Sequence, residues 1–128
     1  MNVIDSSGWI EFFLAGPSGP LFKPVIEQRD ALLVPVIVLY EVHKILSRKL
    51  PAEKVEQALD VMRLGRVVDL TDRRAIAAAN VALKHRLAMA DAVMYSVALE
   101  FKATFWTQDV DYQGLDGVRY CPKPNAPV

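Results

Sequence analysis

The chain has 128 residues, of which 52% are hydrophobic and 23% are charged, so its composition is typical of a folded domain and excludes a disordered segment. Fifteen basic and fifteen acidic residues give a net charge of zero, which does not indicate a general affinity for nucleic acid. The single cysteine, Cys121, excludes an intrachain disulfide framework and a cysteine-rich metal site.

The pattern of apolar residues predicts short strands alternating with helices. We expect strands at 2–4, 32–34, 66–69, 104–107 and 118–120. Between the first two strands we expect a helix capped by Ser6 and Ser7 and stopped by Gly16-Pro17, and a second helix at about 20–29. Further helices should run from Pro35 toward Arg48, from Pro51 onward, from Thr71 to about Lys84, and over about 89–101. This alternation favours an α/β fold with a mostly parallel sheet covered by helices. No repeat or linker divides residues 1–128, and we expect one domain with an extended tail at 122–128.

The beginning of the chain and its hydropathy predict a cytoplasmic protein that does not associate with membranes. Residues 1–5 lack the basic segment and the long apolar core of a signal peptide. The longest apolar run, at 31–40, is interrupted by Pro35 and is far shorter than the ~20 residues that cross a bilayer.

Two acidic residues follow predicted strands directly or nearly so. Asp5 ends the first strand, and Asp109 comes after the strand at 104–107 with one residue between them. In open α/β folds, binding sites form beyond the carboxyl ends of the strands. Aspartate is also a common turn residue, so each placement taken singly fits a structural role equally well.

Two further acidic residues lie among apolar neighbours on predicted helices. Glu41 shares a helix face with Val38 and Ile45, and Asp91 shares one with Met94 and Tyr95. An unpaired carboxylate on a core-facing stripe is costly unless a cation lies nearby, and neither stripe clearly offers an arginine or lysine. Ligation by carboxylates alone selects hard cations, so these residues predict a Mg²⁺ or Mn²⁺ site.

Four segments in this order make the chain resemble the PIN-domain nucleases, and within them the VapC-type toxins of toxin–antitoxin pairs. The segments are residues 3–7 (VIDSS), 35–42 (PVIVLYEV), 91–98 (DAVMYSVA) and 107–112 (TQDVDY). The resemblance runs from residue 2 to about 120. It implies a three-layer α/β/α sandwich with about five strands, and a single PIN domain over residues 1–128.

The resemblance also implies a metal-dependent endoribonuclease whose catalytic acids are Asp5, Glu41, Asp91 and Asp109. Asp5, Asp91 and Asp109 would hold one or two Mg²⁺ or Mn²⁺ ions, with Glu41 binding directly or through water. In-line attack would leave a 5′-phosphate and a 3′-hydroxyl. Two hydroxyl residues, Ser7 and Thr107, would orient the carboxylates, and Asp111 is either a fifth ligand through water or a turn residue.

The expected partners are RNA, a VapB-like antitoxin and a second copy of the chain. A helical antitoxin segment would bind beside the aromatic residues of the two early helices, most of which should belong to the core. Candidate contacts to RNA phosphates are the four basic residues Lys44, Arg48, Arg73 and Arg86.

Two other functions are also compatible with these acidic residues. A PIN-domain nuclease in RNA processing would carry the same acids without an antitoxin. A signalling receiver domain also has an acidic pocket, but it needs paired acids after the first strand and a lysine after the last one. Here Asp5 is followed by serines, and no lysine stands at a strand end.

Overall fold

The fold centres on a five-stranded parallel sheet, in a computed structural model that describes residues 1–124. The strands are short, apolar and rich in β-branched residues, as buried parallel strands are. They are β1 (Asn2–Ile4), β2 (Leu32–Pro35), β3 (Arg66–Val68), β4 (Thr104–Thr107) and β5 (Val118–Tyr120). Their order is β3-β2-β1-β4-β5, and every pair is parallel. The predicted α/β fold with a parallel sheet is therefore confirmed.

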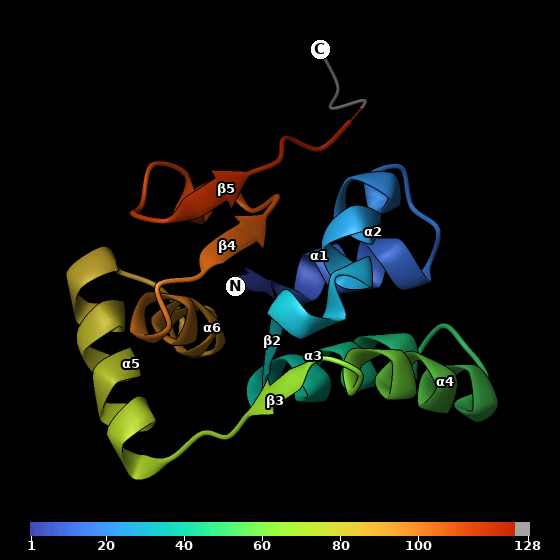
Figure 1. Cartoon of the computed structure of the whole chain (residues 1–128), viewed down its shortest axis with the longest axis horizontal. Coiled ribbons are helices and arrows are strands. Elements are labelled where there is room, and N and C mark those ends of the chain that lie inside the picture. Colours follow the sequence, from blue (N-terminus) through green and yellow to red (C-terminus); the bar gives the residue numbers. More distant parts are fainter. Residues whose placement is uncertain (125–128) are drawn as a thin grey trace.

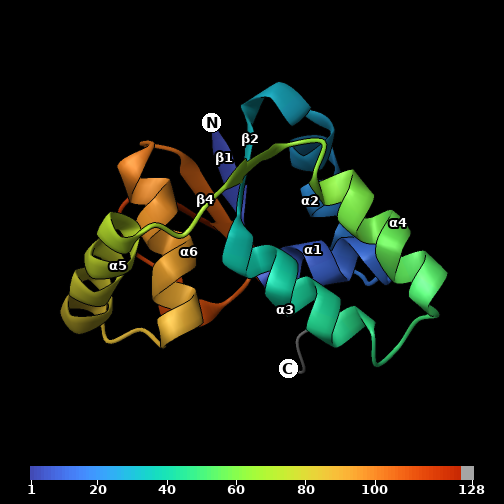
Figure 2. The ribbon, with the colours of Figure 1, turned by 90° about the horizontal axis from the view of Figure 1, so that it is seen from below.

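Helices cover both faces of this sheet. They are α1 (Ser6–Phe13), α2 (Gly19–Glu27), α3 (Val36–Leu46), α4 (Ala52–Met62), α5 (Asp72–His85) and α6 (Met89–Glu100). Figures 1 and 2 show α5 and α6 on one side of the sheet and α1, α2 and α4 on the other. Helix α3 contacts both α1 and α6, so it joins the two layers.

The core lies between the sheet and these helices. Val3, Leu33 and Phe105 of the sheet are fully buried, as are Trp9 of α1 and Phe22 of α2. Burying side chains of this size contributes about 1.5–3 kcal/mol each, and this packing holds the strand ends in place. No helix within residues 1–124 is long and apolar enough to cross a membrane.

The structure corrects two of the predicted boundaries and describes part of the predicted tail. The N-cap of α1 is Asp5 rather than Ser6 or Ser7, because the Asp5 carboxylate accepts the main-chain N–H of Gly8. Pro35 ends β2 instead of lying in the first turn of α3, because it has extended backbone and pairs with Val68. Of the predicted extended tail, residues 122–124 have no regular structure and residues 125–128 lie outside the described residues.

The order of the strands places a binding site between β1 and β4. After β1 the chain adds β2 and β3 on one side, and it later returns to add β4 and β5 on the other. The two neighbouring strands β1 and β4 are thus the point where the strand order reverses. In open α/β sheets, ligands bind beyond the carboxyl ends of the strands at this point. Asp5 and Asp109 follow those two ends.

Candidate active site

Asp5 is a buried carboxylate held by three hydrogen-bond donors. It is 3% exposed, and its main-chain N–H donates to the carbonyl of Trp106 on β4. The Oδ1 atom accepts from the Ser7 hydroxyl at 2.7 Å and from the Gly8 N–H at 3.1 Å. The Oδ2 atom accepts from the Thr107 hydroxyl at 2.5 Å. Burial raises the pKa of Asp5, although these hydrogen bonds act in the opposite direction.

The hydroxyl of Thr107 connects Asp5 to Asp109. Thr107 is fully buried, and the same oxygen that donates to Asp5 accepts the main-chain N–H of Asp109 at 2.9 Å. The Asp109 carboxylate then accepts the N–H of Asp111 at 2.9 Å, which caps a short 3-10 turn at Val110–Tyr112. One threonine therefore sets the relative position of two acids that come from different strands. Asp111 itself is exposed.

Glu41 reaches the site from α3. Its Oε1 atom accepts the Ser6 hydroxyl at 2.9 Å, so the first residue of α1 is tied to the middle of α3. The side chain is half-buried, whereas Val38 and Val42 on the same helix are fully buried. Glu41 thus lies at the rim of the core, and no hydrogen bond from residues 1–124 occupies its second oxygen.

Asp91 lies in the first turn of α6, where the helix dipole favours a negative charge. It is half-buried, and its main-chain carbonyl accepts the hydroxyl of the buried Tyr112 at 3.1 Å. Burial raises the pKa of Asp91. The neighbouring Tyr112 hydroxyl offsets part of that rise, and the charges of Asp109 and Glu41 add to it. Burial, followed by the charges of Asp91 and Asp5, also raises the pKa of the Tyr112 phenol.

These mutual effects indicate that the four predicted acids lie near enough for their charges to interact, and we call them the acidic cluster. Asp109 raises the pKa of both Asp5 and Asp91, and Glu41 raises that of Asp91. The two ion pairs among residues 1–124 join Arg63 to Asp60 and Arg74 to Glu100, and neither includes an acid of this cluster. The cluster therefore carries negative charges that no basic side chain of the described residues pairs with.

The donor set of this cluster fits a hard divalent cation. Carboxylates without histidine or cysteine are the ligands of Mg²⁺ and Mn²⁺, and a cation would offset the repulsion that raises the pKa values. Within residues 1–124, no three acidic, histidine or cysteine side chains converge closely enough to form a ready-made metal cage.

The predicted RNA-binding residues are exposed but do not all lie near the acids. Lys44 is one turn beyond Glu41 on α3, and Arg48 follows the end of that helix. Arg86 ends α5 close in sequence to the start of α6, where Asp91 lies. Arg73 is at the opposite end of α5, about 20 Å away along a helix of this length. The structure therefore separates Arg73 from the cluster.

Several residues around the site were not anticipated from the sequence. Ser6 and Tyr112 contact Glu41 and Asp91, and neither stands in a pattern that indicates such a role. A second polar network adjoins Asp109: the buried Ser18 hydroxyl lies 2.7 Å from Gln108 Oε1 and 2.8 Å from Glu11 Oε2. It links the α1–α2 connection to the end of β4. No sequence pattern indicates this network, because Ser and Gln side chains are usually exposed.

Solved structures similar to this chain include a toxin and toxin–antitoxin complexes. A toxin–antitoxin complex from Klebsiella pneumoniae matches with a TM-score of 0.78 and 15% identity, over 93% of this chain and 96% of that one. The sarcin–ricin loop cleaving toxin VapC20 from Mycobacterium tuberculosis matches with a TM-score of 0.77 and 19% identity, over 93% and 99%. VapBC2 from Rickettsia felis, bound to a DNA fragment from its promoter, matches with a TM-score of 0.72 and 12% identity, over 94% and 97%.

At these identities the structural matches establish the fold alone. None of the curated proteins matches the chain in sequence. The family model of the PIN domain does match, over residues 3–118, a range that includes all four acids of the cluster. The chain therefore belongs to the PIN-domain family.

Proposed function

We propose that this protein is a Mg²⁺- or Mn²⁺-dependent endoribonuclease. The observation that carries the proposal is the cluster of Asp5, Glu41, Asp91 and Asp109, which lies at the reversal of strand order without a basic partner among residues 1–124. Membership in the PIN-domain family supports it, because this is a family of nucleases. The relative that cleaves the sarcin–ricin loop supports RNA as the substrate.

Each side chain of the cluster has a distinct part in the proposed mechanism. Asp5, Asp91 and Asp109 would hold one or two divalent ions, and Glu41 would bind directly or through water. Ser7 and Thr107 fix the Asp5 carboxylate so that its two oxygens face set directions. Asp111 donates its N–H to Asp109 and is exposed, so it can bind through water.

A divalent ion at these residues supplies a Lewis acid for the scissile phosphate and lowers the pKa of a bound water. The protein contributes pre-organisation. The hydrogen bonds that the Asp5 carboxylate accepts from Gly8 and Thr107, and the one that the Asp109 carboxylate accepts from the Asp111 N–H, orient both carboxylates before the substrate arrives, which reduces the cost of ordering them during the reaction. The buried Tyr112 packs against the first turn of α6 and donates its hydroxyl to the main-chain carbonyl of Asp91.

We further propose that the nuclease is the toxin of a toxin–antitoxin pair. A groove of about 350 Å³ lies between α1 and α4, lined by Phe12, Phe13, Leu50 and Val61 with Lys54 at its edge. This is a surface on which the apolar face of an antitoxin helix would dock. Similar folds were solved as toxin–antitoxin complexes, one of them bound to DNA, which supports a VapB-like partner.

A homodimer is the assembly we propose. Ile76 and Leu83, seven residues apart on the outer side of α5, are 67% and 81% exposed, and Met89 at the start of α6 is 75% exposed. Large apolar side chains aligned on one helix face are a typical dimer surface.

The test is cleavage of end-labelled RNA by the purified protein, in Mg²⁺ and in EDTA. We expect metal-dependent cuts that leave 5′-phosphates, and no cuts by the Asp91→Asn variant, which keeps the volume of the side chain. Equal cleavage by the variant contradicts the proposed site. Toxicity on expression that a neighbouring antitoxin gene suppresses supports the toxin, whereas harmless expression of an active nuclease favours a role in RNA processing.

A further inference from the structure

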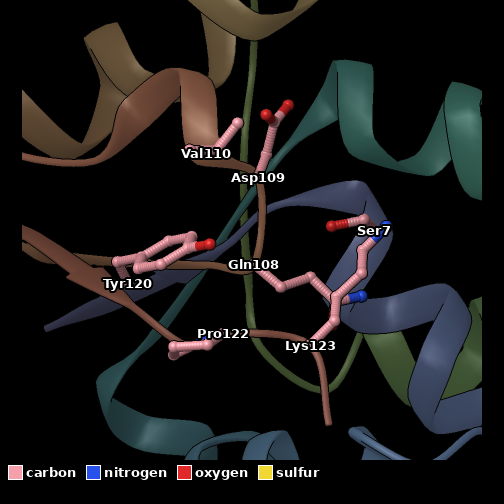
Figure 3. Close-up of a pocket in the computed structure, with 7 residues that line it drawn as sticks. All are labelled: Ser7, Gln108, Asp109, Val110, Tyr120, Pro122 and Lys123. Atoms are coloured by element: carbon pink, nitrogen blue, oxygen red, sulfur yellow. The ribbon is translucent and has the colours of Figure 1, made fainter. Parts of the chain in front are cut away.

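A cavity of about 520 Å³ borders the acidic cluster, and its volume lies within the range of small-molecule sites. Ser7 lines one side of it, and the Ser7 hydroxyl donates to Asp5. Asp109 lines another side. A ligand in this cavity therefore lies directly beside two of the proposed metal ligands (Figure 3).

The opposite wall of the cavity comes from β5 and the residues that follow it. Tyr120 pairs with Thr107 in the sheet, and the N–H of Cys121 donates to the Thr107 carbonyl at 2.7 Å. These bonds fix the end of β5 beside the strand that carries the site. Pro122 and Lys123 continue the wall, and in Figure 3 the Tyr120 hydroxyl points toward the middle of the group while Lys123 extends toward Ser7.

The lining combines the three kinds of group that bind a nucleotide. The ring of Tyr120, with Val110 and Pro122 nearby, offers a flat surface on which an unstacked base can lie. Gln108 presents an amide, the kind of group that hydrogen-bonds the edge of a base. Lys123 supplies a positive charge for a phosphate.

Gln108 is held in place before any ligand binds. It is 5% exposed, and its Oε1 atom lies 2.7 Å from the hydroxyl of Ser18, which is itself 2% exposed and bonded to Glu11. The amide is therefore anchored to the α1–α2 connection, so its position on the cavity wall does not depend on the substrate.

We propose that this cavity is a nucleotide subsite: the base next to the scissile phosphate stacks on Tyr120, and Lys123 contacts a flanking phosphate. The proposal rests on the endoribonuclease function and assigns the substrate as single-stranded RNA, because a paired base is not free to enter such a cavity. It also makes residues 120–123 a determinant of base preference at the cut.

The kinetic test compares Tyr120 variants on a set of single-stranded RNA oligonucleotides that differ in the bases flanking the cut. Tyr120→Ala should raise KM about 5- to 150-fold, the effect of one lost stacking contact, with kcat nearly unchanged and the base preference relaxed. Tyr120→Phe keeps the ring and should restore KM. Tyr120→Leu keeps apolar bulk on β5, so it replaces the alanine variant if that protein does not fold. An unchanged KM and base preference in a folded Tyr120→Leu protein overturns the subsite.

A matched pair of lysine variants tests the phosphate contact. Lys123→Gln should reduce the slope of log(1/KM) against log[salt] by about 0.7, the value for one contact to a single strand. Lys102→Gln removes an exposed charge just before β4, at the opposite end of that strand from Asp109, and should leave the slope unchanged. Equal slopes for the two variants contradict a contact at Lys123.

A binding measurement that needs no catalysis separates this inference from the proposed function. Adenosine and uridine 5′-monophosphates, added to the metal-free protein, should shift the amide NMR signals of residues 7, 108–110, 120, 121 and 123. Ribose 5-phosphate, which lacks a base, should shift them far less, and Tyr120→Leu should abolish the difference. Equal shifts by the base-free sugar phosphate overturn the stacking site even if RNA is cleaved. If RNA is not cleaved, the nuclease proposal fails, and base-dependent shifts would still support a nucleotide site.

Discussion

Replacing Thr107 with valine tests whether one hydroxyl holds the site and the fold together. Valine has nearly the same shape, so the change removes a hydroxyl without opening a cavity. Two hydrogen bonds are lost: the one to Asp5 Oδ2 at 2.5 Å and the one from the Asp109 N–H at 2.9 Å. Thr107 is fully buried, so water does not replace either bond without a rearrangement of the site.

The expected loss in the free energy of unfolding follows from these two bonds. A hydrogen bond to a charged group contributes about 1.5–3 kcal/mol, and an unsatisfied buried N–H costs about 1–3 kcal/mol. Thr107→Val should therefore cost about 2.5–6 kcal/mol near neutral pH. Thr107→Ser keeps the hydroxyl and removes one methyl group, which should cost about 1 kcal/mol.

The loss should also depend on pH, in a direction that the Asp5 carboxyl determines. Burial already raises the pKa of Asp5 in the folded protein, and losing the Thr107 hydrogen bond raises it further. A raised folded-state pKa means that the folded protein holds its proton to higher pH than the unfolded chain. Stability therefore falls as pH rises from the unfolded pKa through the folded pKa, and it falls further in the valine variant. The difference between wild type and Thr107→Val should be smallest below pH 4, where the cost of the unpaired Asp109 N–H remains, and largest near pH 7.

The assay is urea unfolding of both variants and the wild type in EDTA, at several pH values between those limits. Because EDTA removes divalent ions, the measurement reports on the carboxyl and the hydroxyl alone. A loss for Thr107→Val that is the same at low and neutral pH would refute the link to Asp5. A loss for Thr107→Ser as large as that for valine would show that the methyl group, not the hydroxyl, is what stabilises the fold.

Three further predictions concern separate parts of the molecule. Asp91→Asn should raise the melting temperature of the metal-free protein by a few degrees at pH 7 and not at pH 3. Burial and neighbouring charges raise the pKa of Asp91, so its charged form destabilises the fold. Calorimetry in EDTA measures the melting temperature, and a lower value for the variant at pH 7 contradicts the prediction. Gly8→Ala should destabilise the protein by about 1–3 kcal/mol, because a Cβ there would lie 2.7 Å from Ile4 Cγ2 and 2.9 Å from Phe22 Cε1. Urea unfolding measures this loss, and a gain in stability would show that α1 can move away from the sheet. Leu83→Glu should convert the proposed dimer to a monomer in analytical ultracentrifugation, because it places a charge on the apolar face of α5. A wild-type monomer would contradict the proposed dimer, and a dimer that persists in the variant would place the interface elsewhere.

Periodicity was enough to predict the elements of this fold because the strands are short apolar runs and the helices are amphipathic. The expected strand at 66–69 is β3 at Arg66–Val68, and the helix expected from Thr71 is α5, capped by the Thr71 hydroxyl. Parallel pairing also followed, since a helix lies between most successive strands. Boundaries were less certain where two rules compete. Pro35 fits the first turn of a helix and the end of a strand equally well, and pairing with β3 decided for the strand.

The acids could be named from the sequence, but their geometry could not. Strand ends and apolar helix faces single out Asp5 and Asp91, because these are places where a charge is either useful or costly. The contacts that position them come from residues far away in the sequence: Thr107 binds Asp5 across 102 positions, and Ser6 binds Glu41 across 35. Pairings of this length depend on the strand order, which local patterns do not encode.

Asp5 shows how fold and site compete for one carboxylate. As the N-cap of α1 it accepts the Gly8 N–H, and this role favours the charged form. Its burial favours the neutral form. Burial is the larger of these two effects, so the pKa of Asp5 is raised in the metal-free protein. Asp91 has no such capping role, so its replacement by asparagine relieves charge without removing a cap. Asp5→Asn should therefore stabilise the metal-free protein less than Asp91→Asn does, although both should abolish stabilisation by Mg²⁺. An equal gain for the two variants would show that the Asp5 cap contributes nothing that an amide does not.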